Sequence, residues 1–411
     1  MQLSIEGKYL DYFSRGVKYL HNKNYDKALS FFKKSAKGAP IKEVFLNMGN
    51  AYAQLDREAE AIHYFTKSAQ PDVPMSDGTY GPYDLAENNI GLMHFRNGRS
   101  AQAIQHYSRS IELNDGKNGD PLWNYANAYL KLCCTRTEND WELAWKLYRQ
   151  RFFRTSPTPI DTRLPEWDRQ SFVDRLVVLS EQGQGDKIQF GRYLHLLKPY
   201  CKELIVQVPE SMNVFYKGYN CVEELEPYLN NSVCVPFCDL ARIFPWNSVN
   251  ADWIDKTDFV PRDFGGGVNI LVEWAGSLNH ANDRHRSTTS NHFLELQKWG
   301  NLWSFRERAP RGIQSLNTQE DWRGSVEAIL GSDIVVTVDT SIVHVCGALN
   351  HPCIMLQPRK ETDWRWGEDS MGWDNLWYPS VMIARNTGDW NTTFKAVDKK
   401  LEEFFAKNKP A

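Results

Sequence analysis

The side chains best suited to chemistry gather in three short loops, each placed directly after an apolar segment. One of these loops is Asp339–Thr340–Ser341, which precedes a helical pattern that carries His344. Hydroxyl groups and free backbone N–H groups at the start of a helix bind anions, and His344 lies about one helical turn further on, so the spacing fits a diphosphate. An ordinary helix cap beside a buried histidine explains the same residues equally well, and both interpretations stay open.

A second loop, residues 181–186, combines two glycines with an aspartate. Gly183 and Gly185 allow the backbone to approach a ligand closely, and Asp186 falls where a helix is expected to begin. A carboxylate in that place is able to accept a proton from a bound hydroxyl group. Because an aspartate at a helix start is more often a structural cap, this loop indicates a base only in combination with other signals.

The third loop begins at Trp274 and carries Arg284 and Arg286. Two arginines at the carboxyl end of a strand can neutralise a phosphate through bidentate hydrogen bonds. A solvated surface loop is the alternative. The position after a strand favours an anion site.

These loops need a scaffold that brings them together, and the sequence from about residue 173 onward supplies one. Short apolar strands alternate with amphipathic helices over 175–237 and again over 268–358, with three glycines at 265–267 between them. This alternation predicts parallel sheets with helices on both faces, and ligands at the carboxyl ends of the strands. The predicted α/β region has two Rossmann-like halves, followed by a helix that packs back on them: 173–264, 265–390 and 391–411.

The amino-terminal third contains a repeat of small and aromatic residues. The first two copies are 33 residues apart (49 − 16), and the longer offset to the third copy fits the turn-rich insert 71–82. The four copies are Gly16, Tyr19, Ala28 and Phe32; Gly49, Tyr52, Ala61 and Phe65; Gly91, Phe95, Ala103 and Tyr107; and a degraded Trp123, Ala126, Tyr129, Ala144 and Tyr148. Helices that cross at small residues and stack through aromatic ones form an all-α solenoid, predicted over 1–155. The pattern resembles the tetratricopeptide repeat, whose arrays offer a groove to a protein partner, and the proline-rich stretch 156–172 is a linker or a strap on the next domain.

Composition excludes several classes of protein. The formal charge of −3 (48 − 51) over 411 residues argues against a nucleic-acid or membrane-surface protein. No stretch reaches the ~18 apolar residues that span a bilayer, and the first residues lack a signal peptide, so a cytoplasmic protein without a membrane span is expected. The eight scattered cysteines include no C-x-x-C pair, which predicts neither a disulfide framework nor a zinc site.

Four motifs in fixed order carry a more specific resemblance. They are EQGQGDKIQFGRY at 181–193, WAGSLNHANDRHRS at 274–287, SDIVVTVDTSIVHVCGAL with HPCIMLQP within 332–358, and DWRW followed by EDS and LWYPS within 363–380. In this respect the chain is similar, over nearly its whole length, to tetratricopeptide-repeat proteins with a heptosyltransferase-like domain of glycosyltransferase family nine. The resemblance implies the GT-B architecture, with the nucleotide-sugar on the carboxy-terminal half and the acceptor mostly on the other.

The same resemblance implies roles for individual residues. Asp186 would be the general base that deprotonates the acceptor hydroxyl. The donor diphosphate and sugar would be held by Arg284, Arg286, Asp339, Thr340, Ser341 and His344. Further contacts to the cleft are expected from Gln182, Gly183, Gly185, Gln189, Trp274, Asn279, Asp363, Trp364 and Trp366. Because arginines and a helix terminus can stabilise the leaving group, neither a metal ion nor a cofactor beyond the nucleotide-sugar is expected.

The chain also departs from the family pattern. Gln184 and Lys187 stand where relatives commonly have Leu or Met and Thr, so a cation lies next to the proposed base. The segment 304–306 reads Ser-Phe-Arg where relatives often have Ser-Leu-Gln, which leaves recognition of the nucleotide base unassigned. The aromatic residues of this region either stack on a sugar or base, or pack between the two halves: Trp364, Trp366, Trp373, Trp377 and Tyr378.

Two functional hypotheses follow. In the first, the chain is a metal-independent inverting glycosyltransferase that transfers a sugar from a nucleotide-sugar to a hydroxyl of a protein or glycan, with the repeats recruiting or orienting the acceptor. In the second, it is a noncatalytic repeat scaffold, or a sugar- or nucleotide-binding protein, that retains the GT-B fold. The intact set of Asp186, Asp339 and His344 favours the enzyme. The identities of the sugar, the nucleotide and the acceptor do not follow from the sequence.

Overall fold

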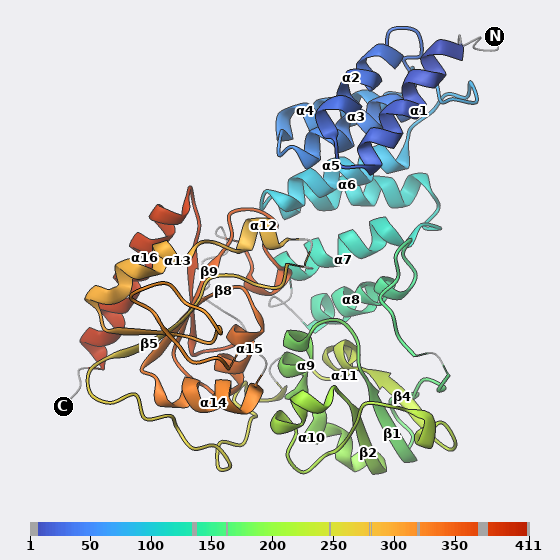
Figure 1. Ribbon diagram of the computed structural model, residues 1–411. Helices are drawn as coiled ribbons and strands as arrows, with labels where there is room; N and C mark the ends of the chain where they lie inside the picture. Colours follow the sequence, from blue (N-terminus) through green and yellow to red (C-terminus); the bar gives the residue numbers. More distant parts are fainter. Residues whose placement is uncertain are drawn as a thin grey trace. The chain divides into compact units, whose positions relative to one another are not determined.

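The computed structural model describes residues 7–133, 138–161, 163–245, 248–278, 280, 282–318, 321–368 and 377–408 (Figure 1). Two compact units make up the chain. The repeat unit comprises Met1–Leu132 and Leu147–Pro157, and the sheet unit comprises Cys133–Lys146 and Thr158–Ala411. Most of helix α8 (Glu138–Tyr148) thus belongs to the sheet unit, although the sequence repeat extends over it.

Pairs of helices build the repeat unit (Figure 1). Their bounds are α1 Gly7–His21, α2 Tyr25–Ser35, α3 Lys42–Gln54, α4 Glu58–Ala69, α5 Asp84–Arg96, α6 Ser100–Leu113 and α7 Gly119–Cys133. Helix α1 packs on α2, α3 on α4 and α5 on α6, while α2 and α4 also contact the first helix of the following pair. The predicted array of all-helical repeats is confirmed.

A glycine faces an aromatic ring at the same place in three of these pairs. A Cβ atom added to the glycine would lie 2.5, 2.4 or 2.7 Å from the nearest ring carbon, in the pairs Gly16 with Phe32, Gly49 with Phe65, and Gly91 with Tyr107. The alanine four residues before each ring is fully buried, as Ala28, Ala61 and Ala103. The small and aromatic positions of the sequence repeat are therefore the positions where the two helices of a pair meet.

The first sheet of the sheet unit has four parallel strands in the order β3-β2-β1-β4. Their bounds are β1 Val173–Leu179, β2 Cys201–Gln207, β3 Asn220–Val222 and β4 Val233–Pro236. The central strand β1 ends in four consecutive buried residues, as expected for a parallel strand covered on both faces. The adjoining helices are α9 Gln184–Gly191, α10 Leu194–Leu197 and α11 Leu240–Ile243.

Part of the proline-rich stretch runs along the outer edge of β4. The N–H of Trp167 donates to the carbonyl of Cys234 at 2.8 Å, and the N–H of Cys234 donates to the carbonyl of Pro165 at 2.9 Å. Leu164 and Trp167 are buried, and Leu164 shares a hydrophobic core with strand residues such as Val177 and Ile205. Of the two alternatives for this stretch, the structure has the strap, which shields an edge strand from solvent.

The second sheet has six parallel strands in the order β10-β9-β8-β5-β6-β7. Their bounds are β5 Asn269–Glu273, β6 Asn301–Ser304, β7 Gln314–Ser315, β8 Ile334–Val338, β9 Cys353–Gln357 and β10 Val381–Arg385. Numbered along the chain from β5, this is the 3-2-1-4-5-6 order of doubly wound sheets. The strand order reverses between β5 and β8 here, and between β1 and β4 in the first sheet, so the predicted parallel α/β region is confirmed.

Helices lie on both faces of the second sheet (Figure 1). On one face, α13 (Ser290–Leu294) and α16 (Trp390–Lys407) share a core with the strands through Phe293, Phe394, Val397 and Leu401. On the other face are α14 (Trp322–Gly331) and α15 (Ser341–Ala348). Helix α16, expected to pack back on the α/β region, packs on β9 and β10.

Candidate functional site

Two of the predicted loops lie at the points where the strand order reverses. β1 leads into α9, and β8 leads through Asp339 and Thr340 into α15. The first turns of α9 and α15 lie against each other, because a Cβ atom added to Gly185 would lie 2.7 Å from Cδ2 of His344 and 3.6 Å from Cα of Ser341. Gly185 thus permits the close approach of a second protein segment, where the sequence predicted the approach of a ligand. Doubly wound sheets bind their ligands at such reversal points.

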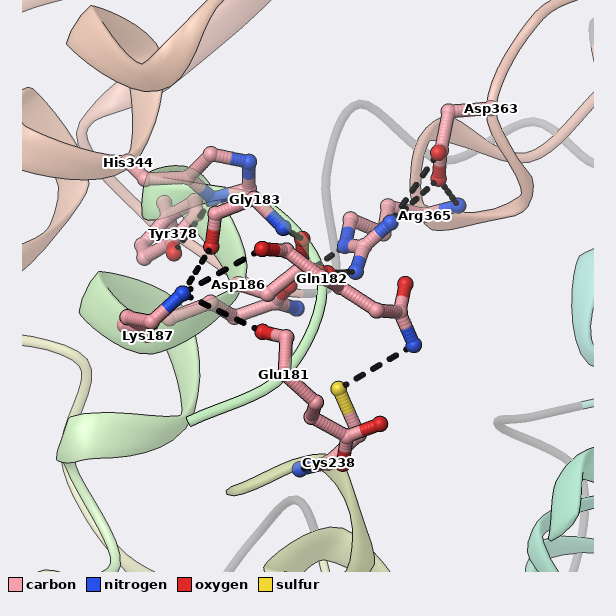
Figure 2. Close-up of polar contacts among 11 residues, drawn as sticks. Glu181, Gln182, Gly183, Asp186, Lys187, Cys238, His344, Asp363, Arg365 and Tyr378 are labelled. Carbon is pink, nitrogen blue, oxygen red and sulfur yellow. Dashed lines mark hydrogen bonds and ion pairs between the residues drawn. The ribbon is translucent and has the colours of Figure 1, made fainter. Parts of the chain in front are cut away.

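Lys187 holds the loop after β1 in shape. Its Nζ donates to the carbonyl oxygens of Glu181, Gln182 and Gly183 at 3.3, 3.2 and 3.4 Å (Figure 2). Burial lowers the pKa of Lys187, while the nearby charge of Asp186 raises it. The cation that the sequence places next to the proposed base therefore binds the backbone of the loop.

The same loop contains a strained residue. Gln182 has a φ of 54°, a left-handed conformation that residues other than glycine rarely adopt. Its Nε2 lies 3.4 Å from Sγ of Cys238, and Oε1 of Glu181 accepts the N–H of Cys238 at 2.9 Å. Backbone strain of this kind collects at functional sites, where the surroundings hold it in place.

Both carboxylate oxygens of Asp186 are engaged. Oδ2 accepts the backbone N–H of Gly183 at 2.9 Å, which caps α9. Oδ1 forms an ion pair with Nη2 of Arg365 (Figure 2). The side chain of Asp186 is 14% exposed, so a small group can still reach it. Asp186 is therefore a helix cap and also a partly accessible carboxylate with an arginine partner.

Arg365 joins several of the predicted cleft residues. Its Nη1 donates to Oδ1 and Oδ2 of Asp363 at 3.0 Å each, and its Nε donates to Oε1 of Gln189. Its guanidinium carbon lies 4.4 Å from the ring centre of Trp364. Arg365 was not among the predicted site residues, yet it connects the carboxylates of Asp186 and Asp363 (Figure 2).

The loop after β8 contains a helix cap, Thr340, and a carboxyl group with a raised pKa, Asp339. Oγ1 of Thr340 accepts the N–H of Ile342 at 3.3 Å, so Thr340 is the N-cap of α15. The carbonyl oxygen of Asp339 accepts a hydrogen bond from Nη1 of Arg286 at 3.0 Å. Burial and the nearby charge of Asp363 raise the pKa of Asp339 to about 7, and Arg286 opposes this shift. A carboxyl group that titrates near neutral pH is typical of a functional site.

The two predicted arginines occupy different surroundings. Arg286 lies at the end of α12 (Asp283–Arg286), a segment that the sequence analysis treated as a loop. A Cβ atom added to Gly276 would lie 2.4 Å from Nη2 of Arg286, so this guanidinium fills the space between the loops after β5 and β8. The side chain of Arg284 is exposed. The structure thus brings Arg286 to the loop of Asp339.

Trp274 is covered by an arginine that follows β6. The guanidinium carbon of Arg306 lies 5.0 Å from the centre of the Trp274 ring. Nε of Arg306 donates to Oε1 of Glu273 at 2.7 Å, and Nη2 donates to the carbonyl of Ala275 at 2.6 Å. Burial raises the pKa of Glu273, and Arg306 lowers it. The unusual arginine of the 304–306 segment therefore secures the end of β5.

His344 is a buried histidine. Its Nδ1 lies 2.8 Å from Oη of Tyr378, and the residue is 7% exposed. Burial, together with the charges of Arg365 and Arg192, holds its pKa well below the ordinary value. A neutral imidazole adds no positive charge to a diphosphate site. Of the two interpretations that the sequence left open, these surroundings favour the buried histidine.

The tryptophans near the site pack against one another. Trp364, Trp366, Trp377 and Tyr378 are each at most 3% exposed. The ring of Trp364 lies 5.6 Å from that of Trp145 and 5.8 Å from that of Trp377. These are normal distances for aromatic packing, so the packing alternative explains the four residues.

Sequence reasoning missed two residues of this cluster. One signal in the sequence could have indicated Arg365, which stands between two tryptophans. Tryptophans are often buried, and a charged side chain that is buried with them needs a partner of opposite charge. His280 belongs to the third loop, and its pKa is lowered by burial and Arg286 and raised by Asp363 and Asp186, which places its imidazole among the site's charges. Two residues named in the sequence analysis, Asn279 and Trp373, lie outside the described residues.

Positive charge next to the carboxylates comes from arginines. Arg365 accompanies Asp186 and Asp363, and Arg286 lies beside Asp339. Within the described ranges, no three His, Cys, Asp or Glu side chains gather closely enough to hold a metal ion. Over the same ranges, no helix is both long enough and apolar enough to cross a membrane.

Comparison with known proteins bears on the repeat unit. The family model of the tetratricopeptide repeat matches residues 43–70, which hold α3 and α4. No curated protein matches the sequence. The chain is similar to the solved structure of the first TPR of Spaghetti bound to an HSP90 peptide, with 21% sequence identity, a TM-score of 0.26, and coverage of 30% of this chain and 90% of that chain. It is also similar to MamA, with 17% identity, a TM-score of 0.28, and coverage of 34% of this chain and 75% of that chain. A third similar structure is PilW, a type IV pilus biogenesis factor, with 23% identity, a TM-score of 0.28, and coverage of 34% of this chain and 60% of that chain. The family match thus identifies one tetratricopeptide repeat at residues 43–70, within a unit of repeated helix pairs.

Proposed function

We propose that the sheet unit is a metal-independent inverting glycosyltransferase of the GT-B type, and that the repeats recruit or orient a protein or glycan acceptor. One observation carries the proposal. The first turn of α9, with Asp186, and the first turn of α15, with Ser341, lie against each other at the reversal points of two parallel sheets. This arrangement brings the turn that carries a carboxylate next to a helix terminus that is suited to anions.

The chemistry of an inverting transfer suits these groups. The acceptor oxygen attacks the anomeric carbon while the bond from that carbon to the diphosphate oxygen breaks, and the hydroxyl proton must leave. Asp186 would take this proton. The first turn of α15 and the guanidinium of Arg286 would stabilise the negative charge of the departing nucleoside diphosphate, so the reaction would need no metal ion.

The second hypothesis, a noncatalytic repeat scaffold or a nucleotide-binding protein, also has specific support. Both oxygens of Asp186 already have hydrogen-bonding partners, and His344 is buried. The tetratricopeptide array serves protein interaction under either hypothesis. Ligand binding and turnover therefore have to be measured separately.

A thermal-shift screen of the full chain against ADP, GDP, UDP, CDP and their common sugar conjugates tests the donor site. At a hundred times its Kd, a ligand should stabilise the unit that binds it by about 2.7 kcal/mol. We expect one nucleotide to raise the melting temperature, and we expect Arg286→Gln to weaken this effect. If no nucleotide raises it, the scaffold hypothesis is favoured.

Turnover tests the base. With the nucleotide-sugar identified in that screen, Asp186→Asn should lower transfer by about 10²–10⁴-fold while it leaves nucleotide binding within a few-fold. Asp174→Asn is the matched control, because Asp174 lies in β1 and pairs with the exposed Lys202. Retained turnover in Asp186→Asn would remove Asp186 as the base, and binding without any turnover would indicate a nucleotide-binding protein.

A further inference from the structure

One arginine ties together carboxylates that belong to different sheets. Asp186 lies in the first turn of α9, which follows β1 of the first sheet, while Asp363 and Arg365 follow β9 of the second sheet. Nη2 of Arg365 pairs with Oδ1 of Asp186, and Nη1 bonds both oxygens of Asp363 at 3.0 Å (Figure 2). The side chain of Arg365 is 7% exposed. A guanidinium buried to this degree stays where its partners hold it.

The position of Arg365 is set from several sides. The planar guanidinium presents its N–H groups in a rigid fork, so two carboxylates and an amide oxygen determine its orientation. Asp363 and Gln189 supply two of these contacts, and the ring of Trp364 lies under its plane at 4.4 Å. None of these three contacts involves Asp186. Arg365 would therefore keep its place and impose a direction on the Asp186 carboxylate.

Other charged or titratable groups near Asp186 have hydrogen-bonding partners of their own, and Nδ1 of His280 accepts the N–H of Asn282 at 3.2 Å. Lys187, His280 and Tyr378 interact electrostatically with Asp186. Nζ of Lys187 donates to the carbonyls of the preceding loop, and Oη of Tyr378 lies 2.8 Å from Nδ1 of His344. Among the described residues, Arg365 is the side chain that forms an ion pair with a carboxylate oxygen of Asp186.

We infer that Arg365 is the positioning residue of Asp186, and that it aims the carboxylate at the acceptor hydroxyl only while the loop after β9 meets the first turn of α9. This inference rests on the proposed function. A carboxylate oxygen has two lone-pair directions, so Oδ1 can hold Arg365 and still accept the hydroxyl hydrogen. The base is thereby assembled from both sheets, and the donor-side sheet controls the orientation of the acceptor-side base.

Kinetics and chemical rescue of Arg365→Ala test the inference in the full chain. We expect kcat to fall about a hundredfold, the scale of a misplaced catalytic group, while KM for the nucleotide-sugar changes little. Arg365→Lys should retain part of the rate, and guanidinium ions at non-denaturing millimolar concentration should restore part of the rate of Arg365→Ala. Arg175→Ala is the control, since it removes an arginine–carboxylate pair with Glu203 on β1 and β2.

Two outcomes overturn the inference: an unchanged kcat in Arg365→Ala, or a loss that neither lysine nor guanidinium relieves. Failure of the proposed function gives a different result, because transfer would then persist in Asp186→Asn or be absent from the native chain.

Hydrogen exchange decides the inference in the absence of turnover. The milder variant Arg365→Gln should speed exchange of the Gly183 amide, whose acceptor is Asp186, relative to the native chain and Arg175→Gln. Unchanged exchange at Gly183 in a folded Arg365→Gln protein would contradict the positioning role.

Discussion

Asp186 and Asp339 are carboxyl groups of similar sequence context with different surroundings. Each comes after a buried strand: Asp186 lies in the first turn of α9, and Asp339 lies just before α15. Asp186 is held by the N–H of Gly183 and by Arg365, whereas Asp339 is partly buried near the charge of Asp363. Two acidic groups with different environments are a common basis for a division of roles in a reaction. At this site, the raised pKa of about 7 makes the protonation of Asp339 change near neutral pH.

The pKa of Asp339 predicts a pH-dependent stability. Burial and Asp363 raise this pKa to about 7 from an ordinary value of 3.8, so the folded state binds the proton more tightly than the unfolded state. The resulting contribution of Asp339 to stability is fully present below the pKa that it has in the unfolded state. It is lost as the pH rises through the pKa that Asp339 has in the folded state. As the pH rises from 4 to 8, we expect the free energy of unfolding of Asp339→Asn to increase by about 1 kcal/mol or more relative to that of the native chain. Urea unfolding at the two pH values measures the difference.

Asp174 provides the control of opposite sign. A hydrogen bond from Lys202 lowers the pKa of this exposed carboxylate, so its contribution is present at higher pH and is lost as the pH falls. Because this loss occurs below the ordinary pKa of 3.8, the difference in stability between Asp174→Asn and the native chain should be nearly the same at pH 8 and at pH 4. A pH dependence in Asp339→Asn that equals that of the native chain would contradict the raised pKa of Asp339.

At the scale of the elements, one contact recurs through the repeats. A hydroxyl near the end of the second helix donates to a carbonyl of the first helix at 2.8 Å, in the pairs Ser35 with Tyr9, Ser68 with Lys42, and Ser110 with Asp84. Together with the contacts between glycine and aromatic ring, it fixes the crossing of each helix pair. The sequence repeat revealed the glycine and aromatic positions, because they differ from their neighbours in size, but the serines are too common in helices to stand out.

The glycine contact gives a test of the repeat packing. Gly49→Ala should destabilise the repeat unit by about 1–3 kcal/mol, because its Cβ atom would lie 2.4 Å from the ring of Phe65. Gly7→Ala is the matched control in α1, where no atom lies within 4 Å of the added Cβ atom. Chemical unfolding followed by circular dichroism measures both variants. Equal stability of the two variants would show that the ring moves aside at little cost.

At the scale of the whole chain, the boundary between the two units differs from the boundary of the sequence repeat. Residues 133–146 lie in the region of the sequence repeat, yet they belong to the sheet unit. Nε1 of Trp141 donates to the carbonyl of Ala241 at 2.6 Å, and the ring of Trp145 lies 5.5 Å from that of Phe190. The aromatic cluster of the sheet unit is therefore completed by a helix that the periodicity assigns to the repeats.

This division predicts separate unfolding transitions. Trp145 is 1% exposed, so Trp145→Ala should lower the stability of the sheet unit by about 3–5 kcal/mol and leave the repeat transition in place. Leu143→Ala on the same helix is the control, because Leu143 is 43% exposed. Differential scanning calorimetry of the full chain resolves the two effects. A single transition that shifts as a whole in Trp145→Ala would show that the units unfold together.

The sequence by itself determined the classes of structure. Periodic small and aromatic residues identified the helical repeats, and alternating apolar strands and helices identified parallel sheets, because both patterns follow from local geometry and burial. It also placed Asp186, Asp339 and Arg286 at the carboxyl ends of strands. The strands β3 and β7 were not predicted, since two or three residues carry too little pattern, and β10 was not predicted either.

Tertiary structure alone decided which of these residues meet. Asp186 and Arg365 are 179 residues apart, and no local rule connects them. The same holds for Gly185 and His344, and for Trp145 and Trp364, whose contacts depend on how the sheets and α8 pack. Burial, which sets the pKa of Asp339 and of His344, is a property of that packing and cannot be obtained from spacing along the chain.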